Sequence, residues 1–334
     1  MSRDGVVLDQ NRGRFIPPIF FLMSRRTSPL LAASIGSLFL SALLAKGEAQ
    51  TRKILFFSKS SGFEHEVISY QQGQPSFAEK QLLELGKKNQ WAFTFSKDGS
   101  LFSSPYLQQF DAVFFYTTGD LTAPGTDRNP PMTPAGKQAL LDYVASGKGF
   151  VGTHSATDTF HTNNEAKKGP ERYRNFGPLA DSYVRMIGGE FIKHGDQQKA
   201  RMRCVDPKFP GLEKYAAGFD LKEEWYSLKD FGEDLHVLLV QETEKMTGIE
   251  YQRPAFPATW ARSHGKGRVF YTSMGHREDV WTNPIFQDVL VGGIRWALGD
   301  AKAEIKPNLN QVAPGWAQNP PFPPPATPAE AAPR

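Results

Sequence analysis

The chain has 334 residues, of which 40% are hydrophobic and 22% are charged, a composition typical of a globular protein with a sizeable core. Its formal net charge of +4 is small and no dense lysine and arginine block occurs, so we expect no nucleic-acid partner. The single cysteine, Cys204, excludes an intramolecular disulfide and a cysteine-based zinc site.

The N-terminal segment predicts export. Two arginines precede an apolar run over residues 30–44, and small residues follow up to Ala49. This order is typical of a secretory signal peptide, and the run is shorter than the about 20 apolar residues of a membrane span. We therefore expect translation to start at Met23, residues 1–49 to be an N-terminal extension and signal peptide, and the mature protein to be periplasmic or secreted from a bacterium, without a stable membrane span.

The next hundred residues alternate between strand and helix patterns. Short apolar or alternating runs predict strands, and helix-spaced apolar residues predict helices between them; the strands are expected at 52–59, 91–96, 110–120 and 148–152, and the helices at 75–90 and 133–147. This alternation with short joints predicts an α/β fold with a doubly wound, mostly parallel sheet. Ligands of such sheets bind at the C-terminal ends of the strands, so the loops "SSGFEH", "TTGD" and "THSATDTF" are the first candidates for a site.

The second half of the domain has a weaker pattern. A helix is expected over 177–191, strands over 235–242, 257–263 and 267–275, and a last helix over 283–299. From Lys306 onward the sequence is rich in proline and alanine. We therefore expect residues 50–304 to form one α/β domain and residues 305–334 to be an extended, poorly ordered tail.

The stretch "GKGFVGTHSATDTF", residues 147–160, has the form of a buried strand that runs into a tight turn, as at a nucleophile elbow, but His154 stands at its apex. Histidine suits proton transfer, metal ligation or hydrogen bonding to a sugar, because its unperturbed pKa is about 6.5; a structural role is the alternative. Ser155 lies beside the apex but lacks the flanking glycine pattern of a nucleophile. Asp158 and His161 would form an acid/base pair, contribute to a metal site, or cap the next helix.

Several separated motifs together resemble the ThuA-like (trehalose utilisation) family, a branch of the class I glutamine amidotransferase-like fold. They are "KILFFSKSSGFEHEVI", "TTGD", "GKGFVGTHSATDTF", "IGGEFIKH", "EEWY" and the long segment from Pro257 to Gly299. The resemblance implies a flavodoxin-like three-layer architecture. It also implies that His154 occupies the turn where the amidotransferases keep their cysteine, so that this chain is not a glutamine amidotransferase.

The resemblance implies carbohydrate metabolism, with disaccharides and, by extension, sugars oxidised at the 3-position as substrates. A 3-keto group acidifies the neighbouring C–H bond, so a positioned base can drive β-elimination of the glycosidic substituent or enolisation. We expect an exported lyase, hydrolase or isomerase that acts on a small-molecule carbohydrate, and we consider a functional partnership with a sugar dehydrogenase and a homo-oligomeric state. The alternatives are a non-catalytic carbohydrate-binding protein of the cell envelope and a structural or interaction module.

The candidate site residues come from these motifs. The candidate catalytic residues are His154, Glu224, His194 and Asp120, and the candidate substrate-binding residues are His65, Ser155, Asp158, Trp225, His276 and Trp281. The two tryptophans are included because an aromatic ring beside polar groups can stack on a sugar, with core packing as the alternative. His236 and His264 are expected to be surface residues.

The sequence leaves the cofactor open. A divalent metal would have to be gathered from distant loops, because no two of the favoured histidines have the i, i+4 spacing of a helical zinc motif. A metal gathered in this way would polarise a substrate carbonyl. No glycine-rich dinucleotide fingerprint follows the first strand, so a nicotinamide cofactor is not indicated.

Overall fold

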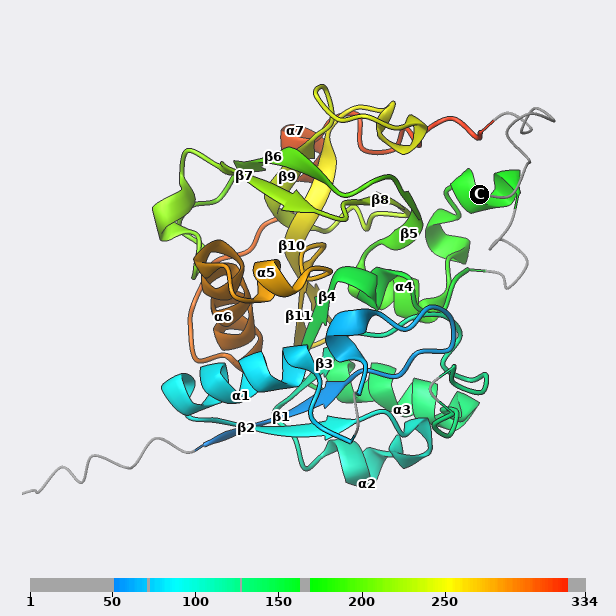
Figure 1. Cartoon of the computed structure of the whole chain (residues 1–334), viewed down its shortest axis with the longest axis vertical. Helices are drawn as coiled ribbons and strands as arrows, with labels where there is room; N and C mark the ends of the chain where they lie inside the picture. The colour runs from blue at the N-terminus through cyan, green and yellow to red at the C-terminus, as the bar shows by residue number, and fades with distance from the viewer. Residues whose placement is uncertain (1–50, 71–72, 127, 163–168, 324–334) are drawn as a thin grey trace, which may run out of the picture. The chain divides into compact units, whose positions relative to one another are not determined.

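A nine-stranded sheet forms the centre of the domain in the computed structural model, which describes residues 51–70, 73–126, 128–162 and 169–323 (Figure 1). The predicted signal peptide and translation start lie outside these residues. Five strands run parallel: β1 (Arg52–Phe57), β2 (Trp91–Ser96), β3 (Ala112–Phe115), β4 (Gly149–Thr153) and β11 (Gly267–Thr272). Four more strands extend the sheet in antiparallel pairing: β6 (Gln198–Cys204), β7 (Phe219–Glu223), β9 (His236–Glu242) and β10 (Phe256–His264).

The strand order is β2-β1-β3-β4-β11-β10-β9-β6-β7. A separate antiparallel pair consists of β5 (Glu190–His194) and β8 (Tyr226–Lys229). The four strands predicted in the first half of the domain are all present in the parallel part of the sheet. This arrangement confirms the expected α/β class and the parallel core.

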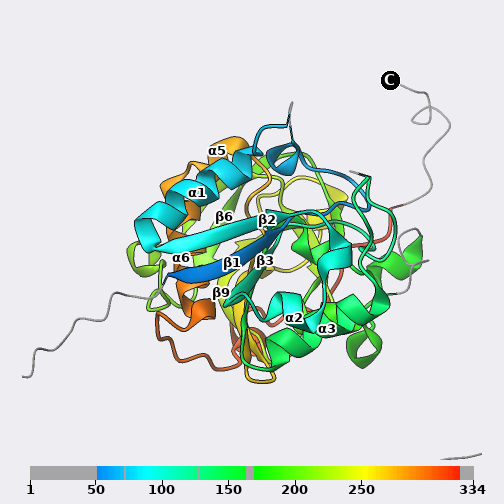
Figure 2. The same ribbon diagram turned by 90° about the horizontal axis from the view of Figure 1, so that it is seen from below.

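Helices cover both faces of the sheet and give the expected three layers. They are α1 (Phe77–Asn89), α2 (Ser104–Leu107), α3 (Pro134–Ala145), α4 (Ser182–Ile187), α5 (Glu278–Trp281), α6 (Pro284–Leu298) and α7 (Leu309–Val312). Figure 2 shows α1, α5 and α6 on one side of the parallel strands and α2 and α3 on the other. Side chains of β1 alternate between the layers: Ile54 and Phe56 join the core under α1 and α6, whereas Leu55 and Phe57 join the core under α3.

Local signals at the helix ends explain why the first-half predictions hold. Ser76 and Glu79 form a capping box at the start of α1, and Thr133 caps α3 by accepting a hydrogen bond from the backbone N–H of Gly136. Pro134 occupies the first turn of α3, where its missing N–H leaves no helical hydrogen bond unmade.

The predicted helix over 177–191 is wrong in extent. Only α4 is α-helical there; residues Gly177–Leu179 form a 3-10 turn, and β5 begins at Glu190. Gly188 ends the helix with a φ of 91°, a left-handed conformation that glycine adopts without a steric penalty. The helix-spaced apolar pattern of the sequence therefore extends beyond the end of α4, and only Gly188 and Gly189 mark the position where the helix ends.

The C-terminal segment up to residue 323 is not the poorly ordered tail that the sequence predicted. Leu309 of α7 is buried, and the side chain of Asn308 bonds both the N–H and the carbonyl of Val237 in β9. His236, expected at the surface, is buried as well, and its ring lies 2.8 Å from the Lys306 carbonyl. Residues 324–334 lie outside the described part of the chain.

None of the helices within the described ranges is both long and apolar enough to cross a membrane.

Candidate active site

Three histidines reach one point from loops that follow parallel strands. His65 follows β1, His154 follows β4 and His276 follows β11, while Glu224 lies in the connection between β7 and β8. One ring nitrogen of each histidine and one carboxylate oxygen of Glu224 all lie within 4.8 Å of one another. These four residues are named here the histidine–glutamate cluster. Its position at the C-terminal ends of the strands is where ligands bind in open α/β sheets.

The turn at His154 has the elbow geometry that the sequence predicted. His154 has a φ of 45°, in the left-handed region, so its side chain leaves the end of β4 sharply. The hydroxyl of Tyr271 donates to the His154 carbonyl at 2.7 Å and supports this turn. The ring is fully buried, and its Nδ1–H donates to the carbonyl of Ser273 at 3.1 Å. This bond places the lone pair of the neutral ring on Nε2, which faces the cluster.

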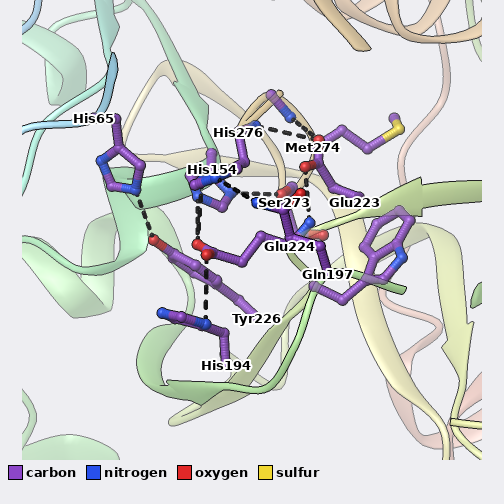
Figure 3. Close-up of polar contacts among 12 residues, drawn as sticks. His65, His154, His194, Gln197, Glu223, Glu224, Tyr226, Ser273, Met274 and His276 are labelled. Carbon is purple, nitrogen blue, oxygen red and sulfur yellow. Dashed lines mark hydrogen bonds and ion pairs between the residues drawn. The ribbon is translucent and has the colours of Figure 1, made fainter. Parts of the chain in front are cut away.

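Glu224 lies at the centre of the cluster (Figure 3). Its Oε2 lies 3.4 Å from Nε2 of His154 and 3.2 Å from Nδ1 of His276. Its Oε1 lies 3.4 Å from Nδ1 of His194, the last residue of β5. One carboxylate thus contacts histidines from three separate segments of the chain.

Charges in the cluster follow from burial and from this shared carboxylate. Burial opposes ionisation of Glu224, but the interactions with His154 and His276 outweigh it and hold its pKa well below the ordinary range. Burial lowers the pKa of His65 and of His154. For His276, burial acts in the same direction, but Glu224 outweighs it and raises the pKa. At neutral pH, His154 therefore presents an uncharged nitrogen to a charged carboxylate.

Glu223 positions a second part of the cluster. Its Oε2 accepts hydrogen bonds from the backbone N–H groups of Gly275 at 2.8 Å and His276 at 3.2 Å (Figure 3). Its Oε1 accepts from the N–H of Glu224 at 2.8 Å. Burial raises the pKa of this carboxyl to about 7, although the three donors favour its ionised form. Glu223 thus fixes the loop that carries His276 to the segment that carries Glu224.

Other predicted site residues lie beside the cluster or apart from it. Ser155 is buried next to His154, and its hydroxyl has no hydrogen-bond partner within the described part of the chain. Asp158 pairs with His161, with 2.6 Å between Oδ1 and Nε2, and lies 3.8 Å from the Arg172 guanidinium. Asp120 accepts two hydrogen bonds from Thr122 and so caps its own turn. The structure therefore does not bring Asp120 into the cluster.

The two tryptophans proposed to stack on a sugar do not have an exposed ring face. Trp225 and Trp281 are both fully buried. The indole N–H of Trp225 donates to the Leu221 carbonyl at 3.3 Å, and that of Trp281 donates to the Gly275 carbonyl at 2.7 Å. Core packing is therefore their role, and the prediction of a stacking contact is wrong for both.

Three residues outside the list of candidate site residues also belong to the site. The Tyr226 hydroxyl lies 3.4 Å from Nε2 of His65, and the side-chain amide nitrogen of Gln197 lies 3.0 Å from Nε2 of His276 (Figure 3). Phe63 is 67% exposed, and its ring stands edge-on to His65 with 5.0 Å between centroids. Tyr226 ends the "EEWY" motif and Phe63 lies in the "SSGFEH" loop, so both could have been proposed from the motifs. No sequence pattern pointed to Gln197.

A cavity of about 330 Å³, a volume at the lower end of ligand pockets, is lined in part by His194, whose ring contacts Glu224 of the cluster. Its lining residues are Arg172, Tyr173, Phe191, Ile192, Lys193 and His194. A larger cavity of about 870 Å³, lined in part by Phe231, Arg262 and Trp316, shares no residue with the cluster. Because the smaller cavity is lined by His194, which contacts Glu224, we consider it the relevant one.

Comparisons with known proteins agree with the fold and with the motifs. Residues 53–297 match the profile of the ThuA family, which is described as trehalose utilisation. A ThuA-like protein from Bacteroides uniformis superposes with a TM-score of 0.55 at 19% identity, over 77% of this chain and 96% of that one. A ThuA-like protein from Parabacteroides merdae gives 0.49 at 17% identity, over 82% and 98%. No curated protein matches the sequence.

At 19% identity the Bacteroides uniformis structure shows the fold alone, which is the glutamine amidotransferase-like α/β fold that the resemblance implied. The family profile spans the whole sheet, from β1 to the end of α6. The sequence motifs, the sheet topology and the profile agree, and this chain belongs to the ThuA family.

Proposed function

We propose that this chain is an exported carbohydrate-processing enzyme and that the histidine–glutamate cluster, together with the adjoining His194, is its reaction centre. The observation that carries the proposal is the single carboxylate of Glu224, which contacts three histidines at the ligand-binding edge of the sheet. Convergent titratable groups with shifted pKa values are typical of catalytic sites. The description of the family, trehalose utilisation, supports a disaccharide or a derivative of one as the substrate.

The exposure of each histidine assigns it a role. The side chain of His154 is fully buried, whereas that of His276 is 20% exposed and that of His194 is 43% exposed. A group that exchanges a proton with a substrate must contact it, so we assign proton transfer to His194. Glu224 orients the His194 ring through Oε1, and its Oε2 contacts the buried His154.

The chemistry we propose is β-elimination from a 3-keto-glycoside. A base removes the proton at C2, which the neighbouring ketone acidifies, and the electron pair forms a C1–C2 double bond. The C1–O bond breaks, and the departing oxygen takes up a proton, releasing one free sugar and one unsaturated keto sugar. The step consumes no water and no redox cofactor. It requires a prior oxidation at C3, so we propose that a sugar dehydrogenase supplies the substrate.

The test is product analysis by mass spectrometry after incubation of the purified chain with disaccharides and with their 3-keto derivatives. We expect release of a free sugar from the keto substrates by the wild type. His194→Ala should lower kcat by at least about 100-fold, because it removes an acid/base group. His264→Gln is the matched control, since His264 lies on the β10–β11 hairpin outside the cluster.

Two outcomes would overturn the proposal. Unchanged turnover in His194→Ala would remove the assigned group from the reaction. Absence of turnover on all substrates, together with a sugar-dependent rise in melting temperature, would favour the non-catalytic carbohydrate-binding alternative, because a ligand that binds only the native state stabilises it.

A further inference from the structure

The atoms of the histidine–glutamate cluster have the spacing of metal ligands. A tetrahedral ion with ligand bonds of 2.0–2.2 Å holds its ligand atoms about 3.3–3.6 Å apart. The distances from Glu224 Oε2 to His154 Nε2 and to His276 Nδ1 are 3.4 Å and 3.2 Å. All four donor atoms lie within 4.8 Å of one another, so closing the set around one ion requires only small side-chain movements.

His154 gives the strongest sign that a cation belongs here. Its Nδ1–H donates to the Ser273 carbonyl, which leaves the lone pair on Nε2. This nitrogen is buried, has no hydrogen-bond partner among the residues that the structure describes, and faces the Glu224 carboxylate. Two lone-pair donors that face each other in a buried site repel unless a proton or a metal ion lies between them. The third and fourth donors, His65 and His276, converge on the same point and favour a metal ion over a proton.

Neighbouring groups orient the candidate ligands, as the outer shell of a metal site does. The Ser273 carbonyl fixes the His154 ring, and Glu223 holds the backbone N–H of His276 at 3.2 Å. The Tyr226 hydroxyl contacts the ring of His65. Figure 3 shows these partners arranged around Glu224 and the histidine rings.

We propose that His65, His154, His276 and Glu224 bind one divalent transition-metal ion. Three imidazole nitrogens and one carboxylate oxygen form a donor set suited to Zn²⁺ and to neighbouring ions such as Co²⁺ and Mn²⁺, and not to the all-oxygen preference of Mg²⁺ or Ca²⁺. His194, whose Nδ1 lies 3.0 Å from the carbonyl of its own neighbour Gly195, is outside this set. The role of the ion in polarising a sugar oxygen rests on the proposed function, whereas the binding of the ion by these four residues does not.

The experiment measures metal binding separately from activity. The full chain is treated with chelator, freed of it, and titrated with Zn²⁺ and with Co²⁺, and bound metal is counted by elemental mass spectrometry. We expect one ion per chain and visible Co²⁺ absorption bands of a nitrogen- and oxygen-ligated ion. His154→Ala and Glu224→Gln should each weaken binding by more than about 100-fold, because removing a ligand costs more than removing its outer-shell partner.

Two further histidine variants serve as matched controls. His264→Gln on the β10–β11 hairpin and His161→Gln, a buried histidine outside the cluster, should keep one ion per chain. Circular dichroism establishes that each variant is folded. Unchanged stoichiometry and affinity in folded His154→Ala and Glu224→Gln would overturn the assignment, as would a folded wild type that binds neither ion at millimolar concentration.

Failure of this inference and failure of the proposed function give different results. Full turnover by the chelator-treated chain would leave the enzyme proposal in place and remove any role for the metal. Stoichiometric metal binding without turnover of any sugar would support the site and overturn the reaction.

Discussion

Two adjacent glutamates perform different tasks in this molecule because successive side chains of an extended chain point in opposite directions. Glu224 contacts the histidines of the cluster, whereas Glu223 binds backbone N–H groups of the loop after β11. The "EEWY" motif led to Glu224 as the candidate site residue, but it did not predict the positioning role of Glu223. The assignment depends on which face of the β7–β8 connection meets β11, and this is set by the whole sheet.

Phe63 is the residue whose exposure most plainly points to substrate contact. An exposed aromatic ring beside polar groups is a favourable stacking surface for a sugar. We expect Phe63→Ala to raise KM for the sugar by about 5- to 30-fold with kcat nearly unchanged, the effect of losing roughly 1–2 kcal/mol of uniform binding. Steady-state kinetics measures both constants. Leu83→Ala, at an exposed position of α1, is the control, and an equal loss in both variants would contradict the assignment.

His161 predicts how stability depends on pH. Burial disfavours its charged form, but hydrogen bonds and charge from Asp158 and Glu190 outweigh burial and raise its pKa above the usual 6.5. Arg172 and Lys229 face those two carboxylates from the other side. A group with a raised folded pKa stabilises the protein fully below its unfolded pKa, and this stabilisation is lost as pH rises through the folded value.

We therefore expect the wild-type free energy of unfolding to fall relative to that of His161→Gln as the pH rises above about 6.5. Denaturant unfolding at several pH values gives the free energy of unfolding of each protein as a function of pH, and the two slopes are compared. All other titrating groups are common to the two proteins, so parallel pH profiles would show that His161 is not charged in the folded state.

At the scale of single residues, the sequence predicted the cluster but not its surroundings. Motif positions identified all four cluster residues. His65, His154 and His276 each follow a strand whose apolar pattern is strong, whereas Glu224 came from the "EEWY" motif, between two strands that the sequence did not predict. The sequence could not show that Trp225 and Trp281 turn inward, since an aromatic residue in a motif is equally compatible with core and rim. Gln197 reaches His276 only through the antiparallel part of the sheet, which local patterns did not reveal.

At the scale of elements, the contact between α6 and β11 depends on a glycine. A Cβ at Gly293 would lie well inside van der Waals distance of three carbons of the buried Phe270 ring. We expect Gly293→Ala to destabilise the fold by about 1–3 kcal/mol through overpacking, despite the better helix propensity of alanine. Denaturant unfolding measures this. Gly62→Ala, where the added Cβ meets nothing closer than 3.8 Å, is the control, and equal stability of the two variants would contradict the packing argument.

The elements that sequence reasoning missed are those with mixed composition. β6 reads "QKARMRC" and alternates buried with exposed positions, so its apolar content is low although its period is that of a strand. β1, β3 and β4 are buried on both faces and read as continuous apolar runs. A sequence pattern therefore identifies the parallel centre of the sheet more readily than its antiparallel edge.

At the scale of the whole molecule, the C-terminal segment is part of the fold. Arg203 and Arg253 bond the carbonyls of Val312 and Trp316, and Leu309 is buried against the core. We expect a chain that ends at residue 304 to lose at least about 2–5 kcal/mol of stability, the cost of exposing one such leucine site. Thermal unfolding compares it with a chain that ends at residue 323. A poorly ordered tail over residues 305–334, as the sequence predicted, would leave the stability of both truncated chains unchanged. Equal melting temperatures of both truncated chains would contradict a structural role for this segment.

The four residues of the cluster come from near the start, the middle and the end of the domain's sequence, and no two of them are close neighbours along the chain. An unfolded or partly folded chain therefore cannot present them together, because loop closure between distant segments must come first. An ion bound by all four would report that folding is complete. The absorption bands of bound Co²⁺ would then appear only with the last step of refolding. Metal ions in the medium would stabilise the folded domain relative to every folding intermediate.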